Sequence, residues 1–280
     1  MIRLPVAADV CERAQVLIAA AVLAGLSGVA GASGCDTSAF DALAGAERSR
    51  WEEFDAQGKS LVRERGTLKL AGLQASGHCG TIDWTAQWTR SQGPRSYDGF
   101  TTRQVPLETR SQLRATALNL AAWLPVTPGW AIGAQLGHRQ IDRDIATSGN
   151  VLGYPEQFEY LHAALGARYQ AALGQRLGLT VSGWLGAGPA GRVRVDLPRA
   201  DPVTLALGSS RLLALSLQLD GGETVQTGWS WQASLNYRRE QAGAGTPEAL
   251  RRNGVTVGAA MQPRVVQQHL GTAANLTYRF

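Results

Sequence analysis

Apolar and polar residues alternate at every second position over most of the chain from Leu61 onward. In one stretch, Ile82, Trp84, Ala86 and Trp88 share one phase, and mostly polar residues fill the other. A period of two is typical of a β-strand with two different faces. The pattern predicts an all-β chain with strands at 48–56, 60–76, 81–91, 107–124, 129–144, 156–171, 176–189, 208–219, 228–241 and 264–280.

The expected strands are longer than the ~5–6 residues of an ordinary globular strand. They suit the ~9–11 residues that a tilted transmembrane strand needs. The connections alternate in length, with short ones near 77–80, 125–129, 172–175 and 220–222, and long ones at 92–106, 145–155, 190–208 and 242–263. A soluble β-sandwich also alternates, but its turns are not sorted by length onto two ends. The sequence therefore predicts a transmembrane antiparallel up-and-down β-barrel.

The number of strands rests on the N-terminal part of the barrel. Eight strands follow from residue 81 onward, and the turn at 77–80 requires a further strand before it, at 60–76. Single-chain barrels of this type have an even number of strands. The segment 48–56 then supplies the tenth strand. Because its sequence RSRWEEFDA alternates poorly, eight strands with an N-terminal plug remain the alternative.

The first 34 residues have a different character. Arg3 and Arg13 precede an apolar run, 16–32, that ends in Ala30-Gly31-Ala32. This arrangement is typical of a signal peptide. We expect a signal peptide at 1–34, a periplasmic N-terminal segment at 35–47 and the barrel at 48–280. A buried core helix is the alternative for the apolar run. No later stretch is long and apolar enough for a transmembrane helix.

The three cysteines add one constraint. Cys11 lies in the expected signal peptide, whereas Cys35 and Cys79 would remain in an oxidising compartment and could form a disulfide. Alternatively, the sequence from Ala32 to Cys35 is a weak lipobox, and Cys35 would then carry a lipid.

The charges suggest a filled lumen. The net charge is +5, and Lys59 and Lys69 are the only lysines, so the excess is almost wholly arginine. The arginines are scattered singly, which disfavours nucleic-acid binding. Several charged or titratable residues fall in the polar, inward phase, where a narrow barrel would pair them: Asp83, Arg110, Arg114, Arg139, Arg143, His162, Arg168, Arg238 and Glu240. An alternative is an anion path lined by these arginines.

Signals for catalysis are weak. The spacing of His and Cys residues matches no metal site, and no motif indicates a cofactor. His162 and Ser182 could form a nucleophile–base pair if their strands align them. Asp142 and Asp144 form a D-x-D sequence at the long-loop end of a strand.

The last residues resemble a known signal. Leu276, Tyr278 and Phe280 lie in one phase at the chain end, and this pattern resembles the C-terminal insertion signal of bacterial outer-membrane β-barrel proteins. The resemblance implies the barrel-assembly machinery as a partner during insertion, and outer-membrane lipid and lipopolysaccharide as the surroundings. The long loops carry Arg192, Arg194, Arg199, Arg251 and Arg252, which could contact lipopolysaccharide phosphates.

The expected count of ten strands is similar to that of omptin proteases and Opc-type adhesins. Omptins carry an acidic pair and an Asp/His pair; this chain has Asp142 and Asp144 but no Asp-x-His sequence. We therefore expect an outer-membrane barrel with a structural or surface-binding role and a mostly filled lumen. A small anion-permeable pore and an outer-membrane hydrolase, either an omptin-like protease or a lipid hydrolase, are the alternatives.

Overall fold

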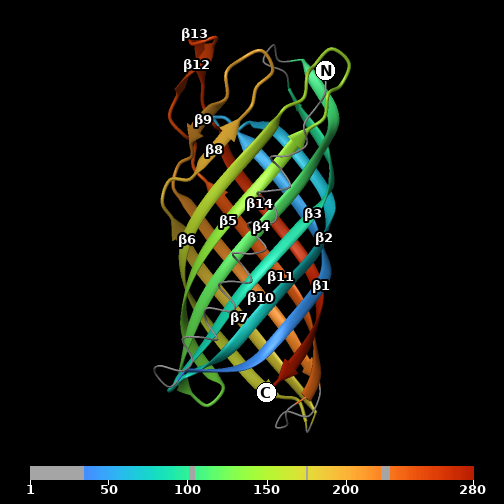
Figure 1. The fold of residues 1–280 in the computed structure, drawn as a ribbon, viewed down its shortest axis with the longest axis vertical. Coiled ribbons are helices and arrows are strands. Elements are labelled where there is room, and N and C mark those ends of the chain that lie inside the picture. Colours follow the sequence, from blue (N-terminus) through green and yellow to red (C-terminus); the bar gives the residue numbers. More distant parts are fainter. Residues whose placement is uncertain (1–34, 101–104, 175, 222–227) are drawn as a thin grey trace.

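The computed structural model describes residues 35–100, 105–174, 176–221 and 228–280, and ten long strands in it form a closed barrel (Figure 1). Each pairs antiparallel with its neighbours, in the order β5-β4-β3-β2-β1-β14-β11-β10-β7-β6, and β5 pairs with β6 to close the ring. The bounds of the barrel strands are β1 Cys35–Phe54, β2 Ser60–Cys79, β3 Ile82–Phe100, β4 Pro106–Thr127, β5 Trp130–Ile145, β6 Pro155–Ala172, β7 Leu177–Gly188, β10 Ser210–Gly221, β11 Gly228–Ala242 and β14 Arg264–Arg279. The prediction of ten strands is confirmed, and the first strand is part of the wall rather than a plug.

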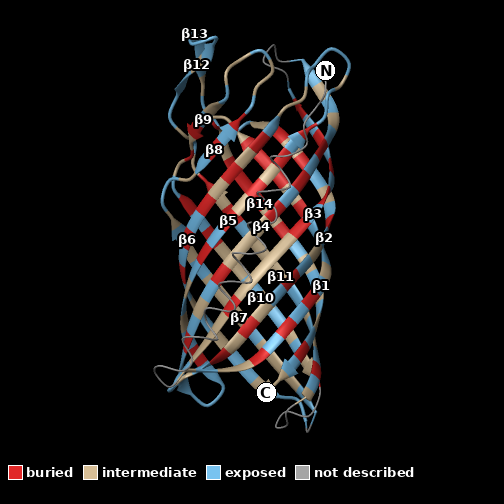
Figure 2. Cartoon of the chain, viewed as in Figure 1, coloured by how far each residue is buried: buried red, intermediate tan, exposed pale blue. Residues whose placement is uncertain are grey.

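Alternating residues face the lumen and the outside along each strand, which gives the checkered burial in Figure 2. The outward positions between the two ends form an apolar belt; large exposed members are Leu73, Leu120, Ile132, Leu136, Leu161, Leu165, Val181, Leu185, Leu215, Leu217, Leu235, Leu270 and Leu276. Ring closure leaves no unpaired strand edge, which is the requirement for a sheet in hydrocarbon. Among the described residues no helix is long and apolar enough to cross a membrane.

Several strands extend further than the sequence pattern predicted. β1 begins at Cys35, so residues 35–47 belong to the barrel and do not form a separate periplasmic segment. Ala42, Ala44 and Ala46 occupy its outward positions, and such small residues hide the alternation. β3 continues to Phe100, so most of the expected loop 92–106 is strand. The expected signal peptide, 1–34, lies outside the described residues.

Two small hairpins lie beyond the barrel wall at the long-loop end. β8 (Arg192–Val195) pairs with the first part of β6, past the end of β7, and β9 (Val203–Ala206) pairs with β8. β12 (Glu248–Arg252) and β13 (Val255–Ala260) pair only with each other and project from the barrel (Figure 1). Asn253 and Gly254 join them, both with positive φ (51° and 80°), as a tight two-residue turn requires.

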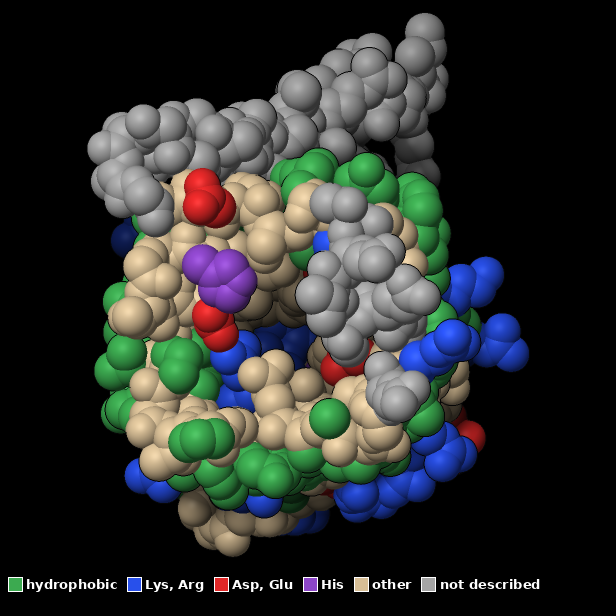
Figure 3. Space-filling view, turned by 90° about the horizontal axis from the view of Figure 1, so that it is seen from below, with side chains coloured by type: hydrophobic (Ala, Val, Ile, Leu, Met, Phe, Trp, Pro, Cys, Tyr) green, Lys and Arg blue, Asp and Glu red, His purple; other side chains and the backbone are tan. Residues whose placement is uncertain are grey.

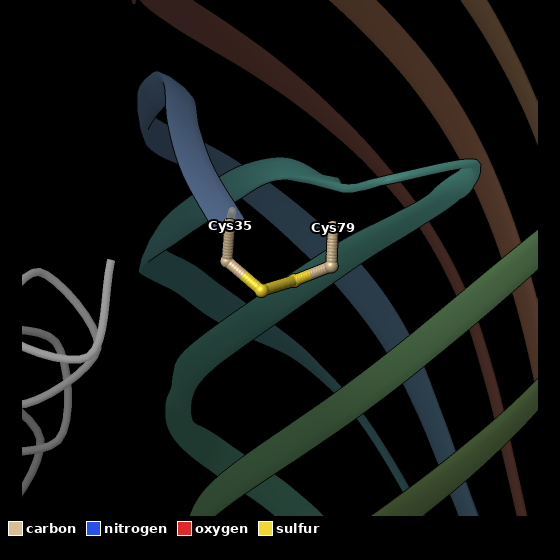
Figure 4. Close-up of a disulfide and its surroundings, with 2 residues drawn as sticks. All are labelled: Cys35 and Cys79. Atoms are coloured by element: carbon tan, nitrogen blue, oxygen red, sulfur yellow. A yellow bond between two sulfur atoms is a disulfide. The ribbon is translucent and has the colours of Figure 1, made fainter. Parts of the chain in front are cut away.

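A disulfide joins Cys35 and Cys79 at the short-turn end (Figure 4). Cys35 is the first residue of β1 and Cys79 the last of β2, and the two lie opposite each other in the strand register. The disulfide therefore links the first residue of β1 covalently to the last residue of β2. Since the Cys35 Sγ atom is used in this bond, it is not free to carry the thioether-linked lipid that the lipobox alternative requires.

Candidate functional site

The lumen is filled by apolar side chains at the long-loop end. Trp51, Ile141 and Phe158 point inward from β1, β5 and β6 and are fully buried. The rings of Trp51 and Phe158 meet edge to face with centroids 4.8 Å apart. The β8–β9 hairpin and the segment after it close this core from one side with Val193, Val195, Leu205 and Leu207. A barrel interior packed in this way resembles the core of a soluble domain.

A buried ion cluster lies within the same core. The Arg143 guanidinium contacts three carboxylates: Nε lies 2.8 Å from Glu64 Oε1, and Nη1 lies 2.6 Å from Glu53 Oε1 and 2.8 Å from Glu156 Oε2. Arg95 Nη2 lies 2.6 Å from Glu64 Oε2. Buried charges are tolerated when they are paired in this manner. We call these five residues, together with the apolar core around Trp51, the plug.

Ser111 and Trp51 donate hydrogen bonds to the carboxylates of this ion cluster. Ser111 donates a hydrogen bond to Glu64 (2.6 Å), and Trp51 Nε1 donates one to Glu53 (2.9 Å). Burial, together with the nearby Glu156 carboxylate, raises the pKa of Tyr154, in the connection before β6, so its phenol stays protonated.

A second ion cluster lies deeper in the lumen. Glu240 accepts hydrogen bonds from Arg139 (3.3 Å) and Arg238 (3.1 Å). Arg139 Nη2 lies 3.1 Å from His269 Nε2, and His269 Nδ1 lies 3.0 Å from Glu47 Oε1. Because arginine can only donate, His269 Nε2 accepts and its proton sits on Nδ1, facing Glu47. The cluster links β1, β5, β11 and β14 across the lumen.

The other half of the lumen is hollow. A cavity of about 530 Å³ extends from Arg139, Arg238 and His269 toward the short-turn end. It continues into a space of about 610 Å³ at the mouth, where Arg168 Nη2 lies 2.5 Å from Asp83 Oδ2. Viewed from this end, the barrel has a recess with blue Lys or Arg side chains inside it (Figure 3). The lumen is therefore a pocket that opens at the short-turn end and ends at the plug.

Seven of the nine residues expected in the lumen do point inward: Asp83, Arg139, Arg143, His162, Arg168, Arg238 and Glu240. They do not form one network, because Arg143 belongs to the plug, Arg139, Arg238 and Glu240 to the deeper cluster, and Asp83 and Arg168 to the mouth. His162 is buried, with neither ring nitrogen hydrogen-bonded to a described residue.

Arg110 and Arg114 are the exceptions. Both are exposed on the outward face of β4, where Arg114 lies opposite Asp142 of β5. Placing them in the lumen was wrong, because the polar phase was assumed to face inward along the whole strand. Beyond the apolar belt the outward face also meets water, and polar residues can occupy it.

The geometry gives little support to the catalytic alternatives. Ser182 lies opposite Arg168 in the β6–β7 register, whereas His162 lies six residues before Arg168 on β6, toward the long-loop end. Asp142 faces outward and accepts a hydrogen bond from Gln157 (3.0 Å), and Asp144 is exposed. No group of residues suited to hold a metal ion occurs in the described ranges.

Sequence reasoning missed several members of the two clusters. Glu47 lay outside the expected strands, Arg95 fell in an expected loop, and Glu53 and Glu156 were not selected. Continuing the alternation of 81–91 past residue 91 would have placed Arg95 on the lumen side with Asp83. The residues of the expected insertion signal, Leu276, Tyr278 and Phe280, are exposed at the short-turn end, where Phe280 and Tyr278 pack at 5.3 Å between ring centroids.

No family model matches the sequence, and a search of curated proteins finds no match. Among solved structures, the outer-membrane protease OmpT from Escherichia coli is similar, with a TM-score of 0.54 and 13% identity over 88% of this chain and 97% of that one. The translocator domain of the autotransporter NalP from Neisseria meningitidis also matches (TM-score 0.43, 11% identity, 98% and 100% covered), as does the β domain of the Bordetella autotransporter BrkA (0.43, 12%, 88% and 100%).

The chain folds as a bacterial outer-membrane β-barrel. With the apolar belt on its outside, this fold places the protein in the outer membrane. In such barrels the short turns face the periplasm and the long loops face the exterior. The plug of this barrel therefore lies at the extracellular end, and the hollow half of the lumen opens toward the periplasm.

Proposed function

We propose that this protein is a non-conducting outer-membrane barrel with a structural or surface-binding role that its extracellular segments carry out. The observation that carries the proposal is the plug, in which Trp51, Phe158 and Arg143 are fully buried inside the barrel wall. A hydrated path for ions would have to pass through this packed core and break ion pairs of 2.6–2.8 Å.

The β12–β13 hairpin supports the surface-binding part of the role. Asp201 fixes the hairpin by accepting hydrogen bonds from the backbone nitrogens of Asn253 (3.1 Å) and Gly254 (2.9 Å). Val255 and Val257 are more than half exposed on it. An anchored hairpin with exposed apolar side chains is suited to contact another surface.

Single-channel recording in planar bilayers tests the closed lumen. The wild-type protein should give no conductance steps, even though its arginines line the hollow half of the lumen. A variant in which a short Gly-Ser linker replaces residues 192–206 removes Val193, Val195 and Leu205 from the plug and serves as the comparison. Discrete anion-selective steps from the wild-type protein would contradict the proposal and favour a pore.

The surface role needs a separate measurement. Trypsin added to intact cells should cut at Arg251 or Arg252 in the projecting hairpin and leave the barrel wall intact. An Arg251→Gln/Arg252→Gln variant is the matched control and should resist this cut. If the hairpin is cleaved only after the outer membrane is permeabilised, it does not face the exterior, and the proposed role fails.

A further inference from the structure

Basic residues follow the extracellular edge of the apolar belt. On seven strands, the first residue beyond the belt that faces outward and carries a full charge is Lys or Arg: Arg48 of β1, Lys69 of β2, Arg90 of β3, Arg114 of β4, Arg211 of β10, Arg239 of β11 and Arg264 of β14. On β5 and β6 it is Asp142 and Glu159. We call the seven basic residues the basic girdle. The periplasmic edge differs, because aromatic residues such as Trp130, Tyr169 and Trp229 lie there on the outward face. The two edges therefore meet surroundings of different chemistry.

The girdle is densest on β1 and β2. Their outward faces carry Arg48, Arg50, Arg63, Arg65 and Lys69. Glu52 is the one outward carboxylate in this part of the two strands, and it already contacts Arg50 (2.6 Å) and Arg63 (3.0 Å). Five cations against one carboxylate leave an excess of four positive charges on this patch, which we call the β1–β2 patch.

The strand register adds to this imbalance. Arg50 and Arg65 lie directly opposite each other across β1 and β2. Like charges at opposed positions destabilise a sheet unless an anion lies between or beside them. Within the described parts of the chain, Arg48, Arg65 and Lys69 form no ion pair. Asp98 of β3 lies opposite Arg63 and adds one carboxylate beside the patch. It does not pair with Arg48, Arg65 or Lys69, so the protein alone does not neutralise these three cations.

The position of the patch indicates the source of the anion. Arg48 lies opposite Leu270 of β14, which is about half exposed on the apolar belt. On β2, Ala71 and the exposed Leu73 follow Lys69 on the same outward face, toward the periplasmic end. The cations thus begin at the height where contacts with acyl chains end, and a lipid places its phosphate at this boundary. Arginine and lysine are the side chains that bind phosphate groups.

We propose that the β1–β2 patch binds the phosphate groups of a phosphorylated glycolipid of the outer leaflet, with the acyl chains of that lipid on the belt next to Leu270 and Leu73. Arg48, Arg65 and Lys69 are the principal ligands. The site goes beyond the proposed function, since it concerns the wall of the barrel and not its loops. It also assigns a role to Arg114 and the rest of the girdle, as further contacts for neighbouring lipids of the same kind.

Binding of lipopolysaccharide to the purified, folded protein in detergent tests the proposal. The wild-type protein should bind phosphorylated lipopolysaccharide more tightly than an enzymatically dephosphorylated preparation, and binding should weaken as salt increases. The variant Arg48→Gln/Arg65→Gln/Lys69→Gln should bind about a hundredfold more weakly. The control is Arg176→Gln/Arg279→Gln, which removes two cations at the short-turn end, far from the patch, and should bind as the wild type does.

Three results would overturn the proposal: equal binding of the dephosphorylated lipid, wild-type affinity in the triple variant, or full competition by inorganic phosphate at the same phosphate concentration. The last result would indicate a free-anion site and not a lipid site. Heat-dependent migration on a detergent gel reports whether each variant has folded. If the triple variant does not fold, two single variants replace it in the test. Arg65→Gln should bind phosphorylated lipopolysaccharide more weakly than the wild type, and Arg65→Lys, which keeps the charge, should retain the binding.

Discussion

Arg143 and Glu64 form an ion pair inside the barrel, with the guanidinium Nε atom 2.8 Å from the carboxylate Oε1 atom and both side chains fully buried. The two residues come from β5 and β2, and β3 and β4 lie between these strands in the ring order. The pair therefore connects parts of the wall that are not hydrogen-bonded neighbours. Because Arg143 also contacts Glu53 and Glu156, one guanidinium holds three carboxylates in the plug.

Arg143→Met should strongly destabilise the barrel. It keeps most of the side-chain volume but leaves Glu53, Glu64 and Glu156 with Arg95 as their one close cation. Removing one partner from a buried ion cluster costs about 3–5 kcal/mol. The measurement is the free energy of unfolding in urea for protein refolded in detergent micelles. Arg114→Met removes an exposed arginine and is the matched control, expected within about 0.5 kcal/mol of the wild type. Equal stability of the two variants would contradict the buried pairing.

Trp51→Ala tests the apolar part of the plug. Trp51 is fully buried, packs on Phe158, and lies with its ring 5.0 Å from the Arg143 guanidinium carbon. Truncating a buried tryptophan costs about 3–5 kcal/mol. Trp231→Ala is the control, since Trp231 is half exposed on the outward face and lipid or detergent can fill its place. A double-mutant cycle with Phe158→Ala should show coupling between the two rings; additive losses would mean that they do not pack together.

The fold was predictable because lipid imposes a strict alternation on the crossing part of each strand. That constraint placed Arg139, Arg143 and Arg168 on the lumen side correctly. It fails beyond the belt, because there the outward face meets water and the inward face packs against the apolar core of the plug. The polar residues of β4 therefore lie on the outside at this level, and this is why Arg114 was assigned to the wrong face. It also fails where the outward residues are small, as at Ala42 and Ala44 of β1. The clusters themselves depend on the register between strands, which the pattern of a single strand does not contain.

The disulfide between Cys35 and Cys79 should stabilise the periplasmic end of the barrel. The bond joins two residues with a sequence separation of 44. Removal of such a disulfide lowers the free energy of unfolding by about 2–4 kcal/mol. Cys35→Ser, Cys79→Ser and the double variant should lose the same free energy of unfolding, because each change removes the same bond. Addition of a reducing agent should lower the unfolding midpoint of the wild type only. A further loss in the double variant would show that the cysteines contribute separately.

Leu165→Arg tests the placement of the apolar belt in the membrane. Leu165 faces outward from β6 and is 73% exposed, between Leu161 near the extracellular edge and Tyr169 near the periplasmic edge. An arginine facing lipid near the middle of a bilayer destabilises a barrel by about 2–4 kcal/mol. Unfolding in urea from phospholipid vesicles measures this effect. Gln157→Arg lies on the outward face of the same strand beyond the belt, where an arginine can also donate a hydrogen bond to Asp142, and it should be nearly neutral. If the two variants are equally stable in vesicles, Leu165 does not face lipid.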